Sequence, residues 1–220
     1  MPDIMPETAV VKTMPPVSSH DRILMSAKHL FARNGYENSS TVAIAREAGT
    51  SESQLMKHFG SKQGLLVAIF DRGWTGIMDR VQATQGIAGP AERLLRMLEA
   101  MVVELENDSD LKELVTLESR RVRKDNRDVL LSQGYCQFTN LLEGALGEMQ
   151  RQGQIRPDLK LDAVRAALLG LTEGLVRDRV VARRSELHAD YAFDDIKRIL
   201  EIVVPALDGE ALQPLKAVNR

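Results

Sequence analysis

The side chains of this chain that could act as nucleophiles, bases or metal ligands are few and scattered. The sequence holds one cysteine, Cys136, and four histidines at positions 20, 29, 58 and 188. None of them stands at the spacing of a zinc protease, a hydrolase or a nucleotide-binding loop. The motifs therefore predict no enzyme, no cofactor and no metal site, although residues far apart in the sequence can still converge in a fold.

A different chemistry is indicated between Ser40 and Lys62, where hydroxyl, amide and cationic side chains gather. Short polar groups near the start of a helix can hydrogen-bond to base edges, and cations around it can bind phosphates. The carboxamide of Gln54 suits adenine. The residues predicted to contact DNA are Ser40, Thr41, Ser51, Glu52, Ser53, Gln54, Met56, Lys57, His58 and Lys62.

Three helices must position these side chains. Apolar residues recur at helical spacing from Ile23 to Phe31, and Gly35 then stops the pattern. Two short helices follow on either side of a turn at Gly49, and the second begins with the capping-box pattern Ser51-x-x-Gln54. This arrangement is typical of a helix-turn-helix, whose second helix enters the major groove of DNA. Helical hairpins also occur in bundles that bind no DNA, so the pattern alone leaves both interpretations open.

The composition predicts a helical protein that resides in a reducing compartment. Of the 220 residues 44% are hydrophobic but only 4% are aromatic, which argues against a β-sandwich. The net charge is -2, so any attraction to nucleic acid must come from a local surface. A single cysteine cannot form an internal disulfide, and no apolar run approaches the ~20 residues of a membrane span. Because the proline-rich residues 1–17 also lack a signal-peptide core, we expect a cytoplasmic, all-α protein with no membrane contact.

The segment from residue 22 to residue 66 carries a more specific pattern. It comprises Arg22-Ile23-Leu24, Leu30-Phe31-Ala32-Arg33-Asn34-Gly35-Tyr36-Glu37, Ile44-Ala45, Ala48-Gly49, His58-Phe59 and Ser61-Lys62. This pattern closely resembles the N-terminal domain of TetR-family transcriptional regulators. Two positions depart from the family, because Met56 stands where tyrosine is most often found and Glu52 stands where lysine is frequent. The operator sequence therefore cannot be transferred from relatives.

The resemblance and the breaks in the apolar pattern together divide the chain. Residues 1–17 are expected to form a flexible arm, and residues 18–62 a DNA-binding domain with its helix-turn-helix at 40–59. A long helix from residue 62 to about residue 84 leads into a helical bundle. The resemblance implies that this bundle, residues 63–205, binds a ligand and forms the dimer, and that residues 206–220 are a tail.

The family encloses its ligand between apolar helices, and several side chains here suit such a pocket. Glu173 interrupts an apolar stripe, so it is either a ligand anchor or a partner of Arg177 one turn later. Gly170 and Gly174 suit either a dimer interface or a close internal helix crossing. The predicted pocket residues are Trp74, Met78, Met101, Leu117, Arg121, Phe138, Leu142 and Glu173.

The function implied by the resemblance is that of a homodimeric repressor of transcription. Its partners would be double-stranded operator DNA and a small hydrophobic or amphipathic inducer that releases the repressor from the operator. An activator or a ligand-independent regulator of the same fold is the alternative, and a protein-binding helical adaptor is a more distant one.

Overall fold

The computed structural model describes residues 18–117, 133–186 and 188–208. These residues form α-helices and one short 3-10 helix, with no strand among them, as the composition predicted. The predicted arm at 1–17, the predicted pocket residue Arg121 and most of the predicted tail lie outside the described residues.

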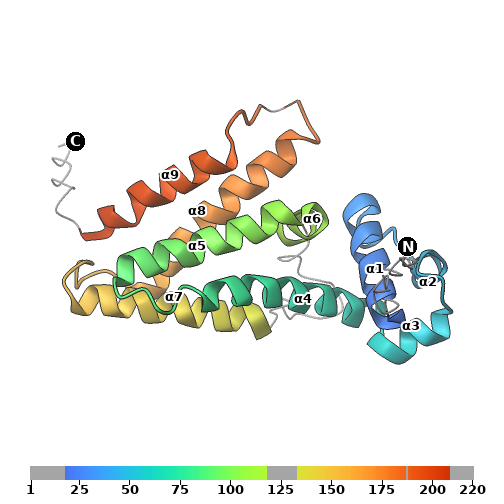
Figure 1. The fold of residues 1–220 in the computed structure, drawn as a ribbon. Helices are drawn as coiled ribbons and strands as arrows, with labels where there is room; N and C mark the ends of the chain where they lie inside the picture. Colours follow the sequence, from blue (N-terminus) through green and yellow to red (C-terminus); the bar gives the residue numbers. More distant parts are fainter. Residues whose placement is uncertain (1–17, 118–132, 187, 209–220) are drawn as a thin grey trace, which may run out of the picture.

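Three helices form a compact unit at one end of the molecule (Figure 1). They are α1 (Ser19–Asn34), α2 (Thr41–Glu47) and α3 (Glu52–Phe59). Helices as short as α2 and α3 are unstable alone in water, so they depend on a shared core. The side chains that form this core and are almost completely buried are Ile23, Ala27, Phe31, Ile44, Leu55 and Leu65.

Local hydrogen bonds set the ends of these helices where the sequence predicted them. The hydroxyl oxygen of Ser40 accepts from the Ala43 amide at 3.1 Å, and that of Ser51 accepts from the Gln54 amide at 3.1 Å. Such N-caps satisfy amide groups that the first turn of a helix leaves unpaired. Gly49 adopts a φ of +64° in the turn between α2 and α3, a conformation that side chains with a Cβ rarely adopt.

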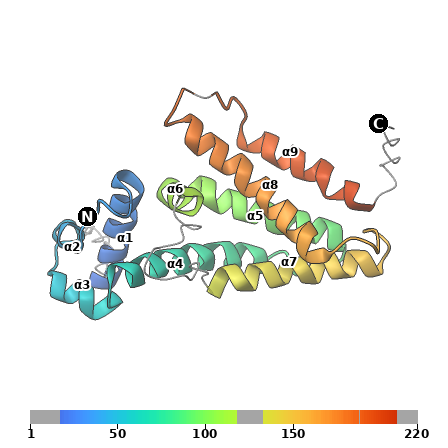
Figure 2. The same cartoon turned by 180° about the vertical axis from the view of Figure 1, so that it is seen from behind.

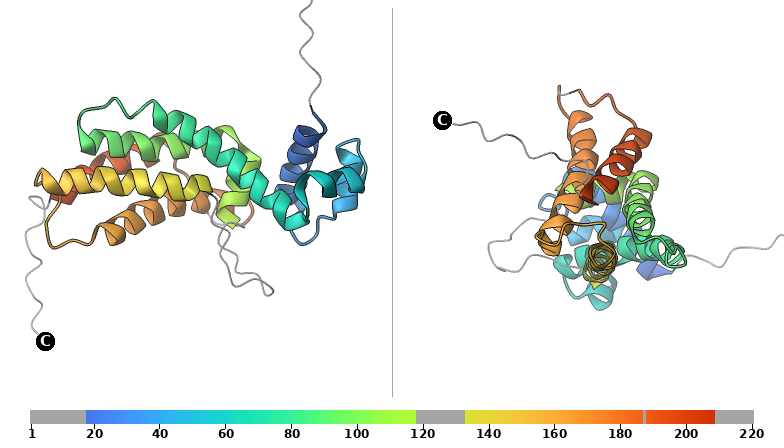
Figure 3. Two further views of the ribbon diagram at one scale, coloured as in Figure 1. Left: turned by 90° about the horizontal axis from the view of Figure 1, so that it is seen from below. Right: turned by 90° about the vertical axis from the view of Figure 1, so that its left-hand side faces the viewer.

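A long helix, α4 (Lys62–Gln82), leads from this unit into the rest of the molecule. Seen from below, α4 leaves the three-helix unit and continues along the bundle (Figure 3, left). The bundle contains α5 (Pro90–Asn107), α6 (Ser109–Leu117), α7 (Gln133–Arg151), α8 (Leu161–Ala182) and α9 (Phe193–Val203), followed by the 3-10 helix Pro205–Asp208.

The bundle is built in layers. Helix α4 packs against α5 and α7, while α8 packs against α6 and α7, and α9 covers α5 (Figures 1 and 2). The contact between α4 and α7 is close at Gly134, where an added Cβ would lie 2.3 Å from the Cβ of Trp74. None of the described helices combines the length and the apolar character that a membrane span needs.

The two glycines of α8 face away from the described helices of their own chain. A Cβ added at Gly170 or at Gly174 would meet no other atom within 4 Å. The described structure therefore contradicts the alternative in which these glycines permit an internal helix crossing. On α9, Ile202 is also a surface residue and is 70% exposed.

Candidate DNA-binding interface

Helix α3 has one buried face and one polar face. Leu55 is fully buried against the other helices of the unit, and Phe59 is half-buried beside it. Gln54 is also half-buried, at the edge of the polar face. The exposed side chains are those of Ser51, Glu52, Ser53, Met56, Lys57 and His58. The predicted DNA contacts on α3 thus share one surface at the end of the molecule, while their contact with DNA stays a prediction.

Helix α2 contributes to the same surface through a bond that the sequence did not predict. The hydroxyl group of Thr41 donates a short hydrogen bond to Oε1 of Glu52. Thr41 is the first residue of α2 and Glu52 is the first residue of α3, so this bond joins the starts of the two helices. Ser40, next to Thr41, is exposed and serves as the N-cap of α2.

Helix α1 reaches the other end of α3. Nε2 of His58 lies 3.1 Å from the hydroxyl oxygen of Ser19 and 3.4 Å from Nε2 of Gln54. The ring of His20 stacks on Phe59, with 4.8 Å between the ring centroids. Ser19 and His20 were not predicted to belong to this surface, and no local pattern indicates it, because they are far from α3 in the sequence.

The capping box predicted at the start of α3 is only half formed. The Gln54 amide does bond to the Ser51 hydroxyl oxygen, but the Gln54 side chain points toward His58. This side chain extends along the helix because a partner is available one turn later. The Gln54 carboxamide therefore lies at the polar surface, where a base-reading group is needed.

Lys62 is engaged with the loop between α1 and α2. Its ammonium group donates to the carbonyl oxygen of Glu37 at 3.3 Å and lies 4.3 Å from the centre of the Tyr36 ring. Lys57, by contrast, is exposed on α3. Of the two lysines, Lys57 is the one whose substitution tests phosphate binding without disturbing this loop.

Charged groups at the edge of the packed helices also connect the α1–α3 unit to the bundle. Nζ of Lys28 on α1 lies 2.5 Å from Oδ2 of Asp108, the residue before α6. Arg184, just after α8, donates to the carbonyl oxygen of Ala32 at 3.0 Å. These bonds connect residues 80 and 152 positions apart, and local sequence patterns carry no signal for them.

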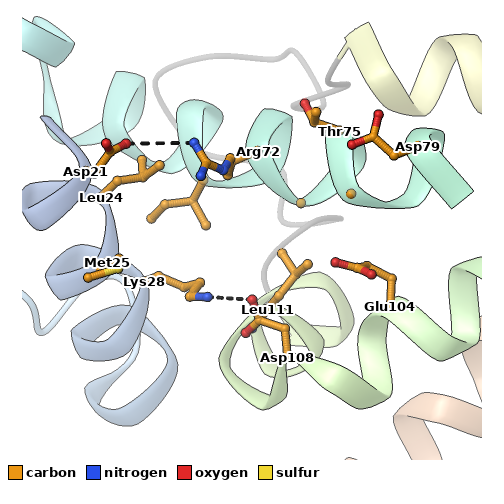
Figure 4. Close-up of a pocket in the computed structure, with 13 residues that line it drawn as sticks. Asp21, Leu24, Met25, Lys28, Arg72, Thr75, Asp79, Glu104, Asp108 and Leu111 are labelled. Atoms are coloured by element: carbon orange, nitrogen blue, oxygen red, sulfur yellow. Dashed lines mark hydrogen bonds and ion pairs between the residues drawn. The ribbon is translucent and has the colours of Figure 1, made fainter. Parts of the chain in front are cut away.

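A cleft of about 590 Å³ separates the two units beside these bonds (Figure 4). Leu24 of α1 and Leu111 of α6 line it, and Arg72 of α4 lies 3.7 Å from Asp21 across it. At its inner side α4 approaches α6 so closely that a Cβ at Gly73 would lie 2.6 Å from the Leu111 side chain. The two units therefore meet through packing of α1 on α4 and α6, with buried apolar side chains in one cluster, and the cleft and the ion pairs lie beside that contact.

Four of the predicted pocket residues, Trp74, Met101, Phe138 and Leu142, are buried in the interior of the bundle. The Trp74 ring packs beside the Phe138 ring, with 5.3 Å between the centroids, and Met101 and Leu142 are buried. Met78 is half-buried next to this core. The Leu117 side chain is outside the described part of the structure, as is Arg121.

Glu173 lies apart from this aromatic cluster. It is half-buried on α8 and lines a small hollow together with Arg177 and Thr116. Its predicted roles, as ligand anchor or as partner of Arg177, stay predictions.

Two capped helices joined by a tight turn, with the second helix exposed and polar, define a helix-turn-helix DNA-binding protein. A family model described as bacterial regulatory proteins of the tetR family matches residues 23–69. The resemblance predicted from the sequence is thus confirmed for this segment, which is similar to the DNA-binding region of TetR-family transcriptional regulators.

Curated relatives and solved structures agree with this assignment. The transcriptional regulator UidR of Escherichia coli K12 is 25% identical over 161 residues, which cover 71% of this chain and 79% of UidR. The structure of the fatty acid degradation regulator FadR from Bacillus halodurans superposes with a TM-score of 0.74 at 20% identity, covering 91% of this chain and all of that one. FadR from Bacillus subtilis, solved in complex with stearoyl-CoA, gives a TM-score of 0.71 at 22% identity, covering 88% of this chain and all of that one. These proteins are transcriptional regulators, not enzymes, in agreement with the sequence prediction.

Proposed function

We propose that the protein is a homodimeric repressor that a small hydrophobic or amphipathic molecule releases from its operator. The DNA-binding domain would span residues 18–62 and the ligand-binding and dimerisation domain residues 63–205. The observation that carries the proposal is the way in which α1 is tied to the bundle by Lys28–Asp108 and Arg184–Ala32. Through these contacts, a rearrangement of α6 or α8 would move α1 and, with it, the recognition helix α3.

A dimer is supported by the outer surface of α8 and α9. Gly170 and Gly174 present an open face on α8, and Ile202 is exposed on α9. Small residues on an open helix face allow the backbone of a second helix to approach closely, which suits the interface of a symmetric dimer. Two recognition helices in a symmetric dimer could then read two half-sites separated by about one DNA turn, ~34 Å.

An inducer would act by favouring one of two arrangements of these helices. A ligand that binds better to an arrangement with another helix separation lowers the affinity for the operator by its differential binding energy. The buried cluster of Trp74, Phe138 and Leu142 supplies an apolar lining for such a ligand. Because the related fold of Bacillus subtilis FadR holds stearoyl-CoA, long-chain acyl-CoA thioesters are the first compounds to test.

Fluorescence anisotropy with labelled DNA from upstream of the gene tests release. Stearoyl-CoA, added to the complex, is expected to weaken operator binding by about 5- to 150-fold, the usual range for allosteric coupling. By reciprocity, calorimetric titration should show that operator DNA weakens stearoyl-CoA binding by the same factor. Equal affinity for the acyl-CoA with and without DNA would contradict its role as inducer.

Sedimentation of the purified protein tests the dimer. At micromolar concentration we expect a species of about twice the 24.5 kDa chain mass. A stable species at the mass of one chain would contradict a homodimer and, with it, the reading of two half-sites.

A further inference from the structure

Glu52 is a carboxylate on a surface that should meet a polyanion. It is the only acidic residue between Ser51 and Phe59, and its side chain is exposed. Repulsion between a carboxylate and DNA phosphates weakens binding to every sequence. Attraction to the positive end of the α3 dipole offers one explanation for an acid at this position. That attraction requires only that the negative charge lies near the start of the helix, in any orientation of the side chain. It therefore does not account for the hydrogen bond to Thr41.

The Thr41 hydroxyl group restricts the Glu52 carboxylate. Its hydrogen bond engages Oε1 of Glu52, which leaves Oε2 as an acceptor on the exposed side of the carboxylate. Because Thr41 is half-buried and begins α2, its position is fixed by the cap and packing of that helix. The carboxylate is therefore held in one orientation at the start of α3, the end of a recognition helix that contacts base edges.

We propose that Glu52, positioned by Thr41, selects cytosine by accepting a hydrogen bond from its N4 amino group in the major groove. An ionised carboxylate only accepts hydrogen bonds. Guanine presents two acceptors in the major groove and thymine presents an acceptor and a methyl group, so both are unfavourable partners. Adenine presents an amino group beside the acceptor N7, which repels the carboxylate, whereas cytosine presents its amino group without a neighbouring acceptor.

This inference rests on the proposed placement of α3 in the major groove. It further specifies the base that Glu52 contacts and the residue, Thr41, that orients Glu52. In this arrangement the charge of Glu52 would lower the affinity for every DNA sequence. At a site that presents a cytosine amino group, the hydrogen bond to that group would offset the loss. Its contribution is thus to the ratio of specific to non-specific binding. Thr41 acts through Glu52 and is a positioning residue.

The experiment uses the full-length protein to select duplexes from a random pool, followed by anisotropy titrations on the selected site. For the native chain we expect one C·G pair per half-site whose replacement by T·A weakens binding by about tenfold, within the usual cost of a mismatched pair. In Glu52→Ala, which has no side-chain acceptor, the same replacement should change binding by less than about twofold, while the affinity for random DNA rises because a negative charge is removed. Thr41→Val should reduce the discrimination at that pair, and Thr41→Ser should retain it.

Lys57→Ala is the matched control on the same helix. Losing this cation should weaken binding to all sequences and leave the preference for the C·G pair intact. Thermal unfolding of each variant shows whether an effect arises from the fold, and Glu52→Leu offers a second variant without an acceptor if Glu52→Ala fails to fold.

The possible outcomes distinguish a failure of cytosine selection by Glu52 from a failure of the proposed placement of α3 in the major groove. If Glu52→Ala selects the same site with the same discrimination as the native chain, cytosine selection by Glu52 is wrong and α3 remains the recognition helix. Cytosine selection is also wrong if only the unfolding temperature changes, since the helix dipole then explains the acid. If the native chain selects no sequence at all, the proposed placement of α3 itself fails.

Discussion

The two ends of this molecule are stabilised in different ways. The α1–α3 unit contains two short helices, α2 and α3, whose starts are fixed by serine caps and which pack through buried side chains such as Ile44 and Leu55. The α4–α9 bundle includes the longest helices, α4 and α8, and its buried apolar side chains continue into the unit, with ion pairs and a cleft beside that contact. Base reading requires fixed side chains, which the capped helices of the unit supply, whereas the proposed induction requires relative movement where the unit meets the bundle.

The largest expected effect comes from cavities placed in the two cores. Leu55→Ala in α3 and Leu142→Ala in α7 each remove a fully buried side chain and should each cost ~2–5 kcal/mol of unfolding free energy. We expect Leu55→Ala to abolish DNA binding at temperatures where the bundle is still folded, because α3 cannot form outside its core. Leu142→Ala should retain DNA binding while the protein remains folded.

Urea unfolding followed by circular dichroism, together with anisotropy on operator DNA, measures both effects. Loss of DNA binding in parallel with global unfolding for both variants would show that the two ends form a single cooperative unit.

Within the recognition surface, a smaller effect is expected from Gln54. Gln54→Ala should relax the preference at one base pair of each half-site, costing ~1–3 kcal/mol at that pair. His58 lies beside the carboxamide, so His58→Ala should relax the same position to a lesser degree. Competition titrations with single-base operator variants measure both changes. Equal weakening on specific and random DNA would assign Gln54 to the phosphate backbone instead.

The contrast between the two ends also explains which features the sequence could predict. The caps at Ser40 and Ser51 involve residues three positions apart, so the pattern of serines and apolar residues was sufficient to place α2 and α3. The contacts of Ser19 with His58 and of Lys28 with Asp108 span 39 and 80 positions. Such pairs depend on which helices pack together. The helical periodicity of a single sequence shows which residues share a face but not which other helix that face contacts.

The same reasoning applies to the candidate sites. The polar face of α3 follows from helical periodicity around Leu55, and it was predicted residue by residue. The bond between Thr41 and Glu52 was not predicted, because it depends on the angle between α2 and α3. In the bundle, periodicity identified buried residues such as Phe138 but could not distinguish a core position from a pocket lining.

The connection between the ends can be tested by reversing one ion pair. Lys28→Asp and Asp108→Lys should each destabilise the protein by about 1 kcal/mol, and the double variant should recover most of that loss. The same variants are expected to alter the response to an inducer more than the affinity for the operator. Urea unfolding in a double-mutant cycle measures the coupling.

The exposed pair Arg156–Asp158, with its atoms 2.8 Å apart, is the matched control, and no measurable coupling is expected there. Additive effects at Lys28 and Asp108 would show that this pair does not connect the two units.

The smallest effect concerns Tyr191, which precedes α9 and lies outside the α1–α3 unit. Its hydroxyl oxygen is 2.7 Å from the Leu175 carbonyl oxygen and 3.0 Å from Oδ2 of Asp178. Burial, followed by the hydrogen bond and the charge of Asp178, raises the pKa of Tyr191 to about 12 from an ordinary value near 10. Because the folded-state pKa is the higher one, the stability contributed by this tyrosine is present below pH ~10 and is lost as the pH rises toward 12. The difference in ultraviolet titration between the native chain and Tyr191→Phe isolates this group, and we expect its midpoint well above 10 while operator binding at neutral pH is unchanged. A midpoint near 10 would show that the Tyr191 hydroxyl group is not held between α8 and the segment before α9 in solution.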